Sequence, residues 1–178
     1  SLLCKLPYKY VRYVYALRWA QMVGALLFGI LLSALLNTIV HYLVADADPS
    51  QLRVHMENTR LHFPPSPHLL IQTLILAPII EETIFRLYID PWLKQPSFLP
   101  SACPSFLLSS LVFSLSHLHA LHVLFILNPL AWLLALITLM VLSQSNAQTY
   151  QHNQQISLPI LSHLGFNLCT WILYLPHT

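Results

Sequence analysis

The sequence predicts an all-α protein, a polytopic bundle of about five transmembrane helices. Of its 178 residues, 56% are hydrophobic and only 8% are charged, whereas a soluble domain carries about a quarter charged residues. The apolar residues fall in long runs, and about 20 such residues cross a hydrocarbon layer of ~30 Å. The net charge of +2 is small and its basic residues gather near one end, so we expect no nucleic-acid partner.

Five apolar segments are the predicted membrane helices, at residues 11–44, 68–93, 105–118, 124–142 and 156–175. The polar stretches between them predict loops, including an uncharged Gln- and Asn-rich loop at 143–155. The Asn128-Pro129 step is expected to kink or delay the start of the fourth helix. We divide the chain into an N-terminal membrane helix with an extramembrane loop, 1–67, and a membrane core, 68–178.

The distribution of basic residues predicts the orientation of the chain. Lys5, Lys9, Arg12 and Arg18 lie before or at the start of the first span, and Lys94 follows the second. Because cytoplasmic segments carry an excess of Lys and Arg, we place the N-terminus in the cytoplasm.

The middle of the second predicted span contains charged residues, which are costly in lipid. A charge at mid-bilayer costs about 2.5–3.5 kcal/mol, so each needs a partner or a water-filled cavity. Glu82 and Arg86 are four residues apart and can pair on one helical face. Glu81 is rotated by about 100° from Glu82 and needs another partner. Pro78 is expected to free the carbonyl of Leu74 and bend the helix just before the carboxylates.

The candidate partners for Glu81 lie on other predicted helices. His117 ends the third span, with Phe113 one turn before it, and His163 and Asn167 lie one turn apart in the fifth span. A carboxylate, two imidazoles and an amide around a cavity can activate water and stabilise an oxyanion. In that chemistry Glu81 is the general base, His117 orients the water, and His163 and Asn167 donate to the oxyanion.

Three short segments resemble a known family. They are E-E-T-I-F-R from Glu81 to Arg86, F-S-L-S-H from Phe113 to His117 and H-L-G-F-N from His163 to Asn167. In order and separation they look like the EExxxR, FxxxH and HxxxN motifs of the CAAX protease and bacteriocin-processing family.

This resemblance implies a helical intramembrane endopeptidase, with 68–178 as its CAAX-protease-like core. It implies catalytic roles for Glu81, Glu82, His117, His163 and Asn167, with Arg86 and Phe113 in support. If a metal such as zinc is present, its ligands would be Glu81, His117 and His163. It further implies membrane lipid and a lipidated, for example prenylated, peptide or protein as partners, and the bacterial inner membrane as the location.

Two other functions stay open on the sequence alone. The chain could be a non-catalytic membrane protein of the same fold, acting as an immunity or scaffold factor. It could also be a small haem or metal carrier, since His119 and His122 follow His117 closely, although their spacing matches no known ligand pattern.

Overall fold

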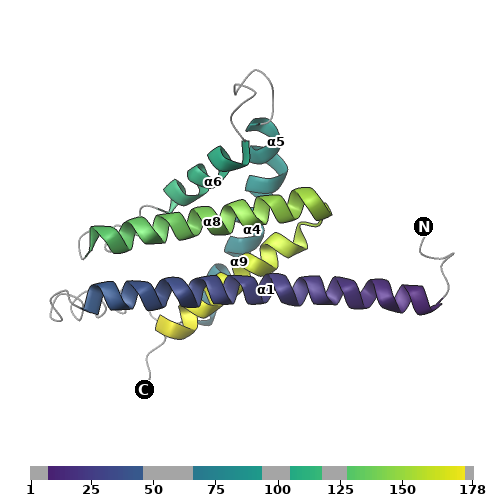
Figure 1. Ribbon diagram of the computed structural model, residues 1–178, viewed down its shortest axis with the longest axis horizontal. Coiled ribbons are helices and arrows are strands. Elements are labelled where there is room, and N and C mark those ends of the chain that lie inside the picture. The colour runs from purple at the N-terminus through teal and green to yellow at the C-terminus, as the bar shows by residue number, and fades with distance from the viewer. Residues whose placement is uncertain (1–7, 46–65, 94–104, 118–127, 175–178) are drawn as a thin grey trace.

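All regular secondary structure in the described part of the chain is helical. The computed structural model describes residues 8–45, 66–93, 105–117 and 128–174 (Figure 1). The predicted all-α fold class is therefore confirmed. The predicted loop over 46–67 and the histidines at 119 and 122 lie outside these ranges, apart from the loop's last two residues.

Within the described ranges, three helical segments are long and apolar enough to cross a membrane. They are Leu17–Leu43 within α1 (Tyr8–Ala45), the continuous helix Pro67–Leu93, and α8 (Pro129–Asn153). The third predicted span corresponds to α6 (Ser105–Ser116), whose 12 residues reach about 18 Å, less than the hydrocarbon layer. The fifth corresponds to α9 (Ser157–Tyr174), with 18 residues.

The helix Pro67–Leu93 alternates between α-helical and π-helical geometry. It runs through α3 (Pro67–Ile71), η2 (Gln72–Leu76), α4 (Ala77–Thr83), η3 (Ile84–Ile89) and α5 (Asp90–Leu93). In η2 the amide of Ala77 donates to the carbonyl of Gln72, five residues back. Continued by one residue, this spacing would pair Pro78 with Thr73, but proline has no amide hydrogen. In this register Pro78 leaves the carbonyl of Thr73 without its backbone donor, and the prediction for the Leu74 carbonyl stays a prediction.

The predicted loop at 143–155 is wrong, because α8 continues to Asn153. The helix ends where Gln154 adopts a left-handed conformation, with φ 53°, and its amide donates to the carbonyl of Tyr150. At the other end the side chain of Asn128 accepts from the amides of Leu130 and Ala131. The prediction that Asn128-Pro129 delays the start of this helix is confirmed.

Helices α1 and α9 approach each other closely through two glycines. A Cβ atom on Gly29 of α1 would overlap the carbonyl oxygen of Ser162, and one on Gly165 of α9 would overlap the carbonyl oxygen of Leu26. Small residues allow such approach between membrane helices. Figure 1 shows α9 crossing alongside α1, with α8 packed against both α1 and α6. The chain division predicted at residue 67 stays a prediction.

The interior of the bundle combines an apolar cluster with buried polar groups. Phe85, Phe113, Leu139, Leu142 and Phe166 form the apolar cluster. Large apolar side chains on the outer surfaces of the helices are exposed, for example Leu31 at 68%. Buried polar groups together with exposed apolar side chains are typical of helices that face lipid.

Candidate active site

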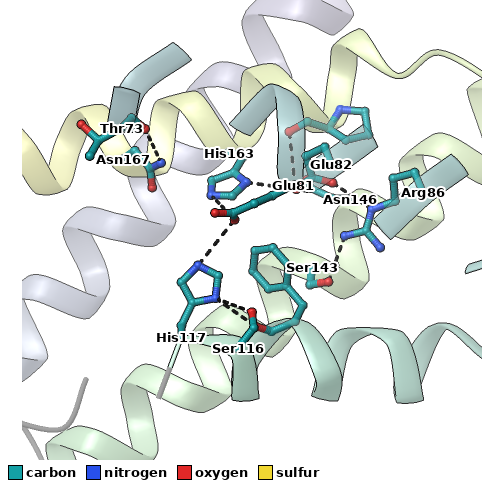
Figure 2. Close-up of polar contacts among 12 residues, drawn as sticks. Thr73, Glu81, Glu82, Arg86, Ser116, His117, Ser143, Asn146, His163 and Asn167 are labelled. Carbon is teal, nitrogen blue, oxygen red and sulfur yellow. Dashed lines mark hydrogen bonds and ion pairs between the residues drawn. The ribbon is translucent and has the colours of Figure 1, made fainter. Parts of the chain in front are cut away.

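Glu81 of α4 faces two histidines that come from two other helical segments. Its Oε2 atom lies 3.5 Å from Nε2 of His117, which follows α6, and 3.7 Å from Nε2 of His163 on α9. Figure 2 shows both rings directed at the carboxylate. Oε2 is buried and makes no hydrogen bond to a described residue, so its lone pairs are available to a small polar group between the three side chains. The structure thus brings Glu81, His117 and His163 together.

The tautomer of His117 follows from its second ring nitrogen. Nδ1 lies 2.8 Å from the carbonyl oxygen of Phe113, and a carbonyl can only accept a hydrogen bond. Nδ1 therefore carries the hydrogen, and in the neutral ring Nε2 is an acceptor. This acceptor faces the Glu81 carboxylate, so a donor such as water is needed to join the two.

His163 is held between the two neighbouring glutamates of α4. Its Nδ1 lies 3.2 Å from Oε1 of Glu82, while its Nε2 faces Glu81. The His163 side chain is 4% exposed and that of Glu82 is 0% exposed. Nδ1 makes no hydrogen bond to a described residue, but the nearby Glu82 carboxylate supplies a counter-charge whenever both ring nitrogens are protonated.

Glu82 belongs to a buried polar network that joins the helix Pro67–Leu93 to α8. Arg86 Nε donates to Glu82 Oε2 at 2.8 Å, which confirms the predicted pair, and Arg86 Nη1 donates to Asp90 Oδ2 at 3.1 Å. From α8, Ser143 Oγ accepts from Arg86 Nη2 at 2.9 Å, and Asn146 Nδ2 donates to Glu82 Oε1 at 2.7 Å. Figure 2 shows Asn146 and Ser143 meeting Glu82 and Arg86. Glu82 and Asp90 both pair with the Arg86 cation, although Asp90 Oδ1 is buried without a hydrogen bond to a described residue.

Asn167 lies one turn beyond His163 but makes a different contact. Its Nδ2 atom donates to the carbonyl oxygen of Thr73 at 2.9 Å, and Thr73 is the residue whose backbone partner Pro78 removes. No hydrogen bond or ion pair in the described ranges joins Asn167 to Glu81 or His117. One hydrogen of its amide group remains for another acceptor.

The ring of Phe113 packs against both imidazoles of the site. It is fully buried, and its ring centroid lies 4.7 Å from that of His117 and 5.6 Å from that of His163. Phe85 packs edge-on against it at 5.1 Å. The predicted supporting residue thus contacts both rings of the site.

The conditional prediction of Glu81, His117 and His163 as metal ligands stays a prediction. Across the described ranges, no three His, Cys, Asp or Glu side chains are placed to hold a metal ion. Glu81, His117 and His163 converge, with both imidazole Nε2 atoms within 3.7 Å of Glu81 Oε2. We derive no step through a metal.

Sequence reasoning missed three residues of the buried network: Asp90, Ser143 and Asn146. Asp90 follows Arg86 by four residues, the same spacing that predicted the Glu82 pair, so a signal for it was present. Ser143 and Asn146 fell in the predicted loop, and nothing in their local sequence distinguishes them from solvated polar residues.

A comparison with protein families tests the resemblance. The model of the type II CAAX prenyl endopeptidase Rce1-like family matches residues 63–169. The chain belongs to this family. No curated protein and no solved structure matches the chain.

Family membership has two consequences for this Rce1-like chain. It supports intramembrane endopeptidase activity of the CAAX type, and together with the three apolar helices it indicates an integral membrane protein. The matched segment includes all the residues of the site described above.

Proposed function

We propose that this Rce1-like protein hydrolyses a peptide bond of a lipidated or membrane-associated substrate, with Glu81 as the general base. The observation that carries the proposal is the convergence of one carboxylate oxygen and two imidazole Nε2 atoms within 3.7 Å. A general base must lie within hydrogen-bond reach of the proton it takes, directly or through one water.

The attacking water would lie between Glu81 and His117. Both Glu81 Oε2 and neutral His117 Nε2 are acceptors, so one water can donate a hydrogen to each. Glu81 takes a proton as the water oxygen bonds to the carbonyl carbon of the substrate. His117 accepts the other hydrogen bond and thereby orients the oxygen lone pair toward that carbon.

The negative charge that develops on the carbonyl oxygen needs donors. His163 supplies one from Nε2 when Nδ1 is also protonated and faces Glu82. The free hydrogen of the Asn167 amide supplies a second. When the carbon–nitrogen bond breaks, Glu81 returns its proton to the leaving amine, and the other proton of the water stays on the new carboxylic acid until that acid ionises to a carboxylate.

Differences in exposure support a substrate-facing role for Glu81 and His117. Their side chains are 31% and 26% exposed, whereas Glu82 and Arg86 are 0% exposed. The exposed pair can meet a substrate, and the buried pair can only act through its neighbours. With the N-terminus in the cytoplasm, we place the protein in the bacterial inner membrane and its substrate, prenylated or otherwise lipidated, at the cytoplasmic side.

The deciding experiment compares Glu81→Gln with wild type in a cleavage assay on detergent-solubilised protein. The substrates are a fluorogenic prenylated peptide and a panel of leader peptides. Loss of a general base lowers the rate by about 10²–10⁴-fold. His117→Gln and His163→Gln should also lose activity, whereas His68→Gln, at an exposed position of α3, should retain it. Loss of the wild-type rate on adding a chelator would indicate a metal, and an unchanged rate would favour water activated by Glu81 without one.

The proposal fails if all three site variants melt like wild type and keep full cleavage. A wild-type protein that cleaves no substrate, together with a cellular phenotype that survives Glu81→Gln, would instead favour a non-catalytic binding role.

A further inference from the structure

A polar cavity lies where α1, α8 and α9 meet. Its volume is about 190 Å³. Ser145, Thr149 and Asn153 follow each other at four-residue intervals on α8 and line one side, opposite Gln21 of α1 and Ser162 of α9. Figure 1 shows that α8 ends and α9 begins beside the N-terminal half of α1, so the cavity lies at that end of the bundle.

The interior end of this cavity reaches the polar network of the candidate active site. Asn146 lines the cavity and also donates to Glu82 Oε1 at 2.7 Å. Ser162, which lines it too, directly precedes His163 in the chain. Neither Glu81 nor His117 lines the cavity, so it approaches the network from another side.

One lining residue is buried and lacks a hydrogen-bond partner. Ser162 is 3% exposed, and no described residue bonds its Oγ atom. A buried hydroxyl without a partner costs about 1–3 kcal/mol, and membrane lipid offers no hydrogen bonds. Ser162 therefore indicates a polar occupant of the cavity.

The lining determines the chemistry of that occupant. Its polar groups are amides and hydroxyls, with apolar Ala25, Phe28 and Leu158 between them, and none of the described residues that line it is charged. A phosphate, carboxylate or cation would have no counter-charge there. Water fits, because it needs two to four polar partners and takes about 30 Å³ in the liquid, so the cavity has room for several molecules.

We propose that this cavity is a hydrated crevice, through which water enters between α1, α8 and α9 as far as Asn146 and Ser162. Water there completes the hydrogen bonds of Ser162 and solvates the network of Glu82 and His163 from a side that a substrate at Glu81 does not cover. The crevice can hold water whether or not the protein is a protease, so the inference stands apart from the proposed hydrolysis.

The test is cysteine accessibility in membrane vesicles, which needs no substrate. The three native cysteines are first replaced by alanine. Ala25→Cys then probes the crevice, and Val23→Cys and Leu27→Cys are the matched controls. Both controls lie on α1 two residues from Ala25, about 3 Å away along the axis, and both are 50% exposed on its outer surface. The reagent is a charged, membrane-impermeant methanethiosulfonate.

Only a hydrated position should react quickly, because the reactive species is the thiolate, which lipid disfavours. We expect Ala25→Cys to react at least about ten-fold faster than both controls. If the rate of modification depended only on depth in the membrane, the rate at Ala25→Cys would lie between those at Val23→Cys and Leu27→Cys. That result would overturn the inference. If Ala25→Cys does not fold, Ser145→Cys against Val141→Cys decides in the same way on α8.

Discussion

The sharpest stability prediction concerns Arg86, whose guanidinium holds two buried carboxylates. It is 0% exposed and donates to Glu82 at 2.8 Å, to Asp90 at 3.1 Å and to Ser143 at 2.9 Å. Arg86→Met keeps the apolar stem but leaves both carboxylates without their cation. Removing one partner of a buried ion pair costs about 3–5 kcal/mol. Since protein stability is typically about 5–15 kcal/mol, the loss is a large fraction of it.

Thermal unfolding in detergent measures this effect directly. For 150–250 residues, each kcal/mol shifts Tm by about 2–4 °C, so Arg86→Met should lower Tm by roughly 6–20 °C. Arg86→Lys keeps the charge but lacks the planar guanidinium that reaches three partners. Its Tm should therefore lie between those of wild type and Arg86→Met. Arg18→Met, at an exposed position of α1, should stay within about 0.5 kcal/mol of wild type. An Arg86→Met protein that melts within about 2 °C of wild type would refute the reasoning, because the carboxylates would then need no buried cation.

Two further predictions test how the site is held. Asn146→Leu removes a hydrogen bond to a buried carboxylate that is worth about 1.5–3 kcal/mol. Because Asn146 acts through Glu82, the variant should lower kcat about ten-fold and leave KM unchanged. A change in KM alone would contradict this role. Gly29→Ala forces a Cβ against the Ser162 carbonyl and should lower stability by about 1–3 kcal/mol in thermal unfolding. Gly24→Ala is the matched control, because no neighbouring atom lies within 4 Å of a Cβ added at Gly24, and this variant should be no less stable than wild type. Equal losses of stability at Gly24 and Gly29 would rule out the proposed overlap.

The parts of the site that sequence could predict depend on short-range geometry and on the cost of charge in lipid. The four-residue spacing of Glu82 and Arg86 predicts their pairing, and the isolation of Glu81 predicts that it needs partners elsewhere. The structure shows both features. Which helices supply those partners depends on tertiary packing, and the choice of His117 and His163 came from their place in apolar segments.

The extension of α8 could not be predicted, because its cause lies on another helix. Residues 143–153 have no apolar periodicity, and Ser, Asn, Gln and Thr are typical of loops. Their helical state is stabilised where Ser143 and Asn146 meet the charges of Arg86 and Glu82. Polar residues that satisfy buried charges look, in sequence, like residues that face water.

The two π-helical segments have a consequence for how the chain tolerates insertions and deletions. They flank α4, the seven-residue segment that contains Glu81 and Glu82. A π turn can be regarded as an α turn with one residue inserted, so each segment shifts the rotational register of the helical residues after it. Deleting a single residue from η2 would rotate α4 by about 100° relative to α3 and turn Glu81 away from the imidazoles. The direction in which the Glu81 and Glu82 side chains point therefore depends on the number of residues in these turns as well as on the identity of the side chains.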